Sequence, residues 1–205
     1  GEIVFFEHNQ EFRGQDVTLL PKLQKVLADN DLTFQDLDRL VTTRGPGSFT
    51  GIRVALATAQ GLSLSLSIGQ QEQPPVPALG VDSFLWVLKT YPQKMSPSKS
   101  VLVLLESLRL ELYGQLFSAE GKVMGAPFSL SPEDISKNPL YKDALCLGNG
   151  AFHMQDYGFQ IDHFMPQATH LANFSATILE NEFEAYPCLP LYVRDADTSK
   201  AKNPK

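Results

Sequence analysis

The chain has 205 residues, enough to bury a substantial hydrophobic core in one or two domains. Its 43% hydrophobic and 20% charged residues are ordinary for a globular protein. The formal net charge of −6 argues against strong nucleic-acid binding by the chain alone, because phosphate contacts require clustered Lys and Arg.

Cysteine content and hydropathy restrict the class further. Two cysteines, Cys146 and Cys188, make neither a disulfide framework nor a zinc site, and they fit buried thiols in a reducing cytosol. No apolar run reaches the roughly 18 residues that a membrane span needs. We therefore expect a cytoplasmic protein that does not enter a membrane.

The first part of the sequence predicts alternating strands and helices. Residues 3–6 read as a strand, residues 17–29 as a helix, and residues 39–43 as a second strand. Thr33 and Asp36 have the spacing of a capping box that opens a short helix between them.

A glycine-rich turn links the strand at 39–43 to a long helix that begins near residue 50. The turn and the start of the helix read Arg44-Gly45-Pro46-Gly47-Ser48-Phe49-Thr50-Gly51-Ile52-Arg53. Glycine permits positive φ angles and close backbone approach, and Ser48 and Thr50 can cap the helix. The free N–H groups at such a helix start can bind an anion. The alternative is an ordinary capped turn that binds no ligand.

This turn is neither a P-loop nor a dinucleotide-binding turn. No Lys lies between Lys25 and Lys89 to reach a terminal phosphate, and the Rossmann spacing is absent. Arg44 and Arg53 flank the turn, where they can hold an anion, pair with carboxylates across a subunit contact, or form an ordinary structural ion pair.

The helix that runs to residue 68 is apolar around most of its circumference, so we expect two of its sides to be buried. One side should cover the sheet. The other side is rich in Ala, Gly and Ser, which suits close contact with another helix, either in a second domain or in a partner subunit.

The rest of the chain continues the α/β pattern. Helices are expected at 81–91, from 131, and at 167–183. Strands are expected at 101–105, 111–117 and 144–147, the last followed by a second glycine turn. The run at 101–105 is continuously apolar, as in a strand covered on both faces. The sequence thus predicts an α/β protein with two lobes.

The glycine turn closely resembles the signature of the TsaB (YeaZ) family, the bacterial tRNA threonylcarbamoyladenosine biosynthesis proteins. That signature reads R-G-P-G-S-F-T-G-[IL]-R and is followed by a helix of small residues. Further similarity covers Gly14–Leu27, Leu79–Phe84, Glu106–Tyr113 and Pro190–Arg194. Gln15 stands where the family has His, and Glu106 where it has Asp.

The resemblance implies the actin-like ATPase (sugar kinase/Hsp70) fold, with two lobes that each contain a mixed sheet and helices. We expect an N-terminal lobe at 1–78, a C-terminal lobe at 79–194 and a disordered tail at 195–205. Family members begin with two strands that precede a segment like Gly1–Val4. The resemblance therefore implies a chain that lacks these first two strands.

The function implied by the resemblance is that of a non-catalytic partner of TsaD, which transfers a threonylcarbamoyl group to the adenosine next to the anticodon of tRNA. TsaE is expected in a larger complex, a homodimer is expected for the chain alone, and tRNA is reached only through the complex. ATP and metal are expected from the partner subunits, with no cofactor in the isolated chain. The expected partner interface comprises Leu20, Leu23, Leu27, Val54, Ala55, Ala57, Thr58, Gly61, Leu62 and Ser65.

Catalytic and metal-binding residues are not visible in the sequence. No two of His8, His153, His163 and His170 are four residues apart, so they cannot form the helical metal pair of TsaD. Ser48 does not lie in a G-x-S-x-G nucleophile elbow. A stand-alone phosphotransferase of the same fold and a peptidase homologue remain the alternatives.

Overall fold

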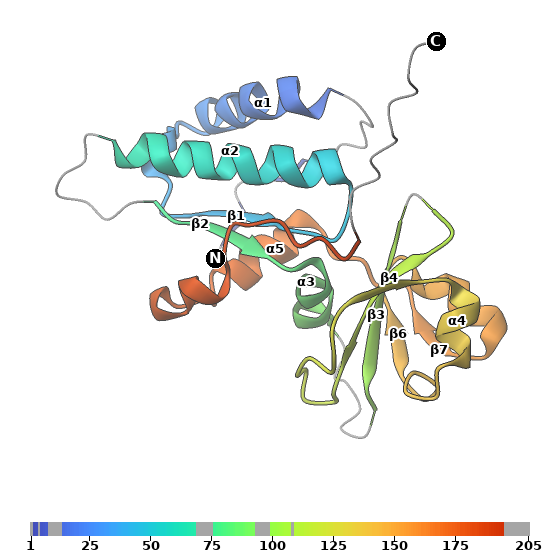
Figure 1. Ribbon diagram of the computed structural model, residues 1–205. Coiled ribbons are helices and arrows are strands. Elements are labelled where there is room, and N and C mark those ends of the chain that lie inside the picture. The colour runs from blue at the N-terminus through green and yellow to red at the C-terminus, as the bar shows by residue number, and fades with distance from the viewer. Residues whose placement is uncertain are drawn as a thin grey trace, which may run out of the picture.

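The structure, a computed structural model, describes residues 2–3, 5–7, 14–68, 76–92, 99–107 and 109–194 and shows two lobes (Figure 1). The expected tail at 195–205 lies outside the described residues. The elements of the first lobe are α1 (Gln15–Asp29), η1 (Phe34–Asp36), β1 (Leu40–Thr43), α2 (Phe49–Ser67) and β2 (Ala78–Val81). The remaining elements are α3 (Ser83–Thr90), β3 (Val101–Glu106), β4 (Leu112–Phe117), β5 (Phe128–Leu130), α4 (Pro132–Lys137), β6 (Leu145–Leu147), η2 (Ala151–Tyr157), β7 (Gln160–Asp162), α5 (Ala168–Ser175) and η3 (Glu180–Ala185).

The first lobe is built on the parallel pair β1–β2, in which Leu40 pairs with Ala78 and Thr43 with Val81. Helix α2 covers one face of this pair, α5 lies on the other side, and α1 packs against α2 on its outer side (Figure 1). Three of the four buried side chains of α2, those of Ile52, Leu56 and Ala59, form a core cluster with Cys188. The expected division between the lobes after residue 78 falls inside β2. Since β2 pairs with β1 over its whole length, all of β2 lies in the first lobe.

The second lobe contains a five-stranded mixed sheet in the order β5-β4-β3-β6-β7. The central strand β3 is antiparallel to β4 and parallel to β6. Its side chains alternate between two core clusters: Leu102 and Leu104 belong to the cluster that contains Met154, whereas Val103 belongs to the cluster that contains Phe84. This confirms the prediction of an interior strand at 101–105.

Two expected elements differ from the structure. The strand expected at residues 3–6 is wrong for the described residues 2–3 and 5–7, which have no ladder partner and no regular structure. The single helix expected at 167–183 is also wrong, because α5 ends at Ser175 and η3 begins only at Glu180. The capping box of Thr33 and Asp36 is confirmed, with the Thr33 N–H donating to the Asp36 carboxylate over 2.8 Å.

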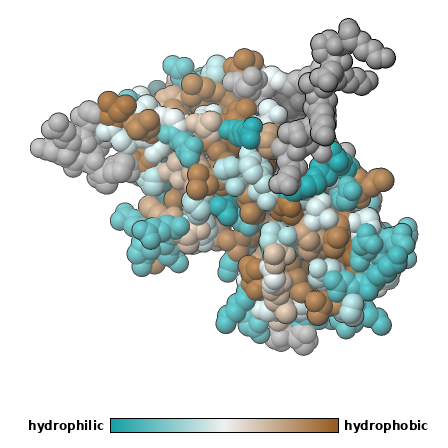
Figure 2. All heavy atoms as spheres, viewed as in Figure 1, coloured by the Kyte–Doolittle hydropathy of each residue, from teal (hydrophilic) through white to brown (hydrophobic). Residues whose placement is uncertain are grey.

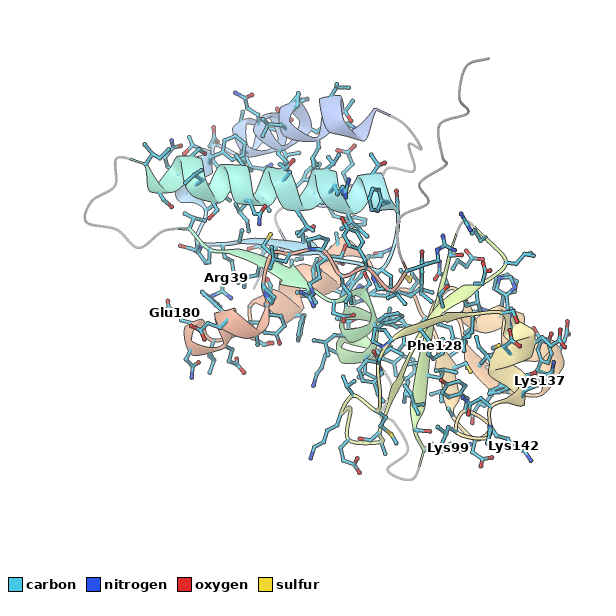
Figure 3. The ribbon with its side chains drawn as sticks, in the orientation of Figure 1. Arg39, Lys99, Phe128, Lys137, Lys142 and Glu180 are labelled. Atoms are coloured by element: carbon cyan, nitrogen blue, oxygen red, sulfur yellow. The ribbon has the colours of Figure 1, made fainter. Side chains whose placement is uncertain are left out.

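The Arg39 side chain binds carbonyl groups at the end of α5. Its Nη1 donates to the carbonyl oxygens of Ser175 (2.6 Å) and Ile178 (3.1 Å), and its guanidinium carbon lies 5.1 Å from the centre of the Phe183 ring. Terminal carbonyls of a helix need such partners. Arg39 and Glu180 lie on the side of the sheet away from α2 (Figure 3). One side chain thus ties the last helices to the first lobe.

No helix in the described part of the chain combines the length and the apolar character that crossing a membrane requires.

We expect Arg39→Ala to lower the free energy of unfolding by about 2 kcal/mol, because two charge-assisted hydrogen bonds to carbonyl oxygens are lost at a half-buried site. Urea denaturation measures this change. Lys25→Ala is the control, since Lys25 forms an exposed i,i+4 pair with Asp29 on α1 and its loss should change stability little. Equal effects of the two substitutions would contradict the structural role of Arg39.

Candidate functional site

Four sequence segments that are far apart in the chain meet at a cleft between the two lobes. The segments are the glycine turn with the start of α2, the β3–β4 hairpin, the turn after β6 that contains Asn149, and the last described residues of the chain. The cleft has a volume of about 560 Å³. It is lined by Pro46, Gly47, Ser48, Phe49, Ile52, Glu106, Ser107, Arg109, Tyr113, Asn149, Leu191, Tyr192, Val193 and Arg194.

Backbone hydrogen bonds fix the glycine turn between β2 and α3. The Arg44 N–H donates to the Val81 carbonyl, and the Gly45 carbonyl accepts from the Ser83 N–H, each over 2.9 Å. Ser48 caps α2 by accepting from the Gly51 N–H (3.3 Å), as expected from the sequence. The Ser48 hydroxyl therefore serves the helix start.

The extended segment 186–193 packs directly on this turn. The Leu191 N–H donates to the Arg44 carbonyl over 2.7 Å, and the Gly80 N–H donates to the Tyr186 carbonyl over 3.0 Å. A Cβ at Gly45 would lie 2.7 Å from the Leu191 oxygen, and a Cβ at Gly80 would lie 2.5 Å from the Pro187 oxygen. Both positions require glycine because another stretch of backbone occupies the space of a side chain.

The Arg44 side chain is half-buried and interacts with other parts of this chain. Its guanidinium donates to the Leu189 carbonyl (3.4 Å) and acts electrostatically on Asp82. Asp82 caps α3 by accepting from the N–H groups of Phe84 and Leu85. Burial raises the pKa of Asp82 above its ordinary value of 3.8, and the two N–H groups and the Arg44 charge oppose this only in part. Of the alternatives for Arg44, these contacts favour a role within the fold, through a carbonyl hydrogen bond and an electrostatic effect on Asp82.

Arg53 has different surroundings. Its Nε donates to the Tyr192 hydroxyl over 2.9 Å, and its guanidinium carbon lies 3.8 Å from the centre of the Phe49 ring. The two rings are 5.3 Å apart. Phe49, Arg53 and Tyr192 therefore form an exposed cluster at the edge of the cleft, which we call the guanidinium clamp.

The opposite wall of the cleft is acidic and polar. The Glu106 N–H donates to the Asn149 Oδ1 over 3.1 Å, and the Asn149 amide donates back to the Glu106 carboxylate over 3.4 Å. His153 Nε2 lies 3.5 Å from the other carboxylate oxygen. No lysine of the described residues lines the cleft. Arg109 and Arg194 also line the cleft, so its lining carries both charges. The Glu106 carboxylate would repel a polyphosphate placed next to it.

Reactive groups are scarce in the described part of the chain. Its His, Cys, Asp and Glu residues include no group of three or more that could hold a metal ion. Both thiols are buried, and burial raises the pKa of Cys146 to about 12 and that of Cys188 above its ordinary value. Protonated thiols of this kind are poor nucleophiles at neutral pH.

The structure separates the expected partner interface into two groups. Leu20, Ala57, Gly61 and Ser65 are exposed. The other six are half-buried, namely Leu23, Leu27, Val54, Ala55, Thr58 and Leu62. The interface stays a prediction, and the exposed group shows which part of it is accessible to another molecule.

Sequence reasoning did not single out Tyr192 or Asn149 as site residues. Tyr192 lies in the terminal P-x-Y-V-R segment and Asn149 in the second glycine turn, so both belonged to noted patterns. Their position at the cleft depends on chain crossings between distant segments, which no local pattern reveals.

The profile of the protein family described as TsaD, tRNA N6-adenosine threonylcarbamoyltransferase, matches residues 13–115, half of the chain. The chain belongs to this family. The match includes α1, the glycine turn, α2, β2, α3, β3 and most of β4.

The chain is also similar to TsaB proteins over a short region. TsaB of Buchnera aphidicola subsp. Schizaphis graminum is 46% identical over 52 residues, and TsaB of Escherichia coli is 34% identical over 67 residues. These matches cover 25% and 33% of the chain, and they span about a quarter of each relative, 25% and 26%.

The fold agrees with a solved structure of this type. YeaZ from Pseudomonas aeruginosa superposes with a TM-score of 0.62 at 20% sequence identity, over 89% of this chain and 86% of that chain. This likeness, together with the family match, confirms the expected actin-like α/β fold. The five-stranded sheet is mixed as expected, whereas the described sheet of the first lobe is the parallel pair β1–β2.

We expect Gly45→Ala to lower the free energy of unfolding by about 3 kcal/mol, because the new methyl group meets the Leu191 carbonyl at a residue with φ of 109°. Gly125→Ala is the matched control. Gly125 also has a positive φ, 89°, but no atom lies within 4 Å of its Cβ position. Gly125→Ala should therefore lower the free energy of unfolding by only about 1 kcal/mol. Equal losses in chemical denaturation would show that segment 186–193 does not crowd the glycine turn.

Asp82 predicts a pH dependence of stability. Folding raises the pKa of Asp82, so the stability linked to its protonation is complete below pH 3.8 and is lost as the pH rises through the higher folded value. Asp82→Asn keeps a cap but does not titrate. We expect the free energy of unfolding of the protein with Asp82, measured relative to that of the Asp82→Asn variant, to fall as the pH rises from 3 to 7. A difference independent of pH would contradict the raised pKa.

Proposed function

We propose that this chain is a TsaB-type protein that takes part in the biosynthesis of threonylcarbamoyladenosine in tRNA as a non-catalytic partner of TsaD. The observation that carries the proposal is the family match over residues 13–115, which includes the glycine turn and both helices, α1 and α2, on which the partner surface is expected. The local similarity to TsaB proteins of two bacteria supports the same assignment.

The cleft supports a binding role more than a catalytic one. Segment 186–193 packs on the glycine turn, and the Ser48 hydroxyl accepts a hydrogen bond that caps α2. Glu106 and Asn149 bond to each other across the opposite wall. We therefore propose that ATP and metal act on the partner subunits, and that tRNA is bound through the assembled complex.

The outer layer of α1 and α2 fits a surface that another protein covers. Val17, Leu20, Leu64 and Ile68 are exposed by 69%, 46%, 66% and 73%. Figure 2 shows hydrophobic side chains along this layer. Ala57 and Gly61 lie on the exposed side of α2 with them, so a second helix can approach closely. We place the TsaD contact, and self-association of the chain when alone, on this layer.

The alternatives make different demands. A stand-alone phosphotransferase needs a nucleotide site in the cleft, and a peptidase needs a metal pair or an activated nucleophile. An ATPase assay and a peptidase assay on the purified chain, beside a pull-down with TsaD from the same source, separate the three functions. We expect binding to TsaD without turnover. Turnover by the chain alone that one substitution abolishes would overturn the proposal.

Gly61→Glu tests the interface. The Cβ position at Gly61 has no atom within 4 Å, so the fold can accept a longer side chain there. In a close contact between helices, however, the carboxylate would be buried without a partner. This should cost about 3 kcal/mol, or about 100-fold in Kd for TsaD.

Gly61→Ala is the matched control for this substitution. It adds only a methyl group at the same open position and favours the helix by up to about 1 kcal/mol. We expect it to fold and to bind TsaD more tightly than Gly61→Glu does, as measured by calorimetry. Unchanged binding by Gly61→Glu would place the interface elsewhere.

A further inference from the structure

The guanidinium clamp contains a cation with free hydrogen-bonding capacity. Arg53 uses Nε for the Tyr192 hydroxyl and stacks on the Phe49 ring. Within the described residues its two Nη atoms make no hydrogen bond, and no carboxylate forms an ion pair with it. Lys22, Lys25 and Lys137 differ, since each pairs with a carboxylate of this chain.

The clamp also restricts the motion of Arg53 before any partner arrives. Stacking on one ring and a hydrogen bond to the hydroxyl of a second limit the rotamers of a side chain that is otherwise exposed. A guanidinium held in this way loses less conformational entropy on binding, and its free edge matches the two oxygens of a carboxylate.

Arg53 lies at one end of the exposed stripe of α2. Residues 53, 57, 61, 64 and 68 follow each other at helical spacing, and all five are exposed. The stripe therefore has an apolar middle and a cationic end. Protein interfaces commonly combine an apolar centre with a polar rim, and arginine is enriched in interfaces relative to the rest of the surface.

We propose that Arg53 is a specificity-determining residue of this interface, which binds an Asp or Glu carboxylate of the TsaD-type partner, and that Tyr192 is its positioning residue. This inference rests on the proposed function. A protein carboxylate fits better than an RNA phosphate for two reasons. The stripe next to Arg53 exposes Leu64 and Ile68, which a phosphate backbone would not cover, and the chain carries a net charge of −6.

The test measures binding of the full chain to TsaD from the same source at low and at moderate salt. Arg53→Glu should raise Kd at least about 10-fold, slow association and reduce its dependence on salt. Lys142→Glu is the matched control, with the same change in charge. Lys142 is exposed and lies on the second lobe away from α2 (Figure 3). Equal Kd values for these two variants would overturn the proposal.

Arg53→Met covers the case in which Arg53→Glu does not fold, because its apolar side chain can still pack on the Phe49 ring. A double-mutant cycle with Tyr192→Phe tests the positioning role. Tyr192→Phe should weaken binding about 3-fold when Arg53 is present and leave it unchanged in the Arg53→Met background. Additive effects would show that Tyr192 acts only on the fold.

Two further outcomes separate this inference from others. If Gly61→Glu weakens binding but Arg53→Glu and Arg53→Met do not, the interface stands and the role of Arg53 is wrong. If none of the three weakens binding, the proposed interface itself is wrong. Binding of tRNA by the isolated chain that Arg53→Met abolishes would identify a phosphate as the ligand and overturn the carboxylate.

Discussion

The packing of segment 186–193 against the glycine turn is the contact on which the rest of the structure depends. The Leu191 amide bonds to the Arg44 carbonyl, and the Leu191 carbonyl occupies the space that a side chain at Gly45 would need. The same segment reaches β2 at Gly80 and accepts from the Gln60 side chain of α2 at Cys188. The turn, the sheet and the helix are therefore fixed by one stretch of extended backbone.

This arrangement changes the meaning of a glycine-rich turn at a helix start. Such turns can offer free N–H groups to an anion. Here the turn bonds to Val81, Ser83 and Leu191, and Ser48 caps the first turn of the helix. The glycines serve close backbone packing. Arg53, the last residue of the glycine motif, lies in the first part of α2, where it packs on the Phe49 ring and bonds to Tyr192.

The two sides of α2 have separate roles that follow from their chemistry. Its branched side chains, Ile52 and Leu56, are buried against the sheet, where they contribute to the hydrophobic core of the first lobe. Its small residues, Ala57 and Gly61, lie outward, where an absent side chain leaves room for another helix. A helix that is apolar on both sides can thus support the fold and a contact with a partner.

The sequence alone determined the class of the fold and most of its elements. The interior strand at 101–105, the capping box of Thr33 and the Ser48 cap follow from periodicity and local hydrogen bonding, which act between near neighbours. The resemblance in the glycine turn indicated the family and the actin-like fold. These features depend on contacts within a few residues or on an extended motif, so the sequence shows them directly.

Only the tertiary structure decided where distant segments meet. Arg39 bonds to the carbonyls of Ser175 and Ile178, 136 and 139 residues along the chain, at the point where the helix expected at 167–183 is divided. Tyr192 reaches Arg53 across 139 residues. Arg44 and Arg53 look equivalent beside the turn, yet one is held by a backbone carbonyl and the field of Asp82, and the other faces outward. Such differences arise from chain crossings, whose geometry depends on the whole core and not on the local sequence.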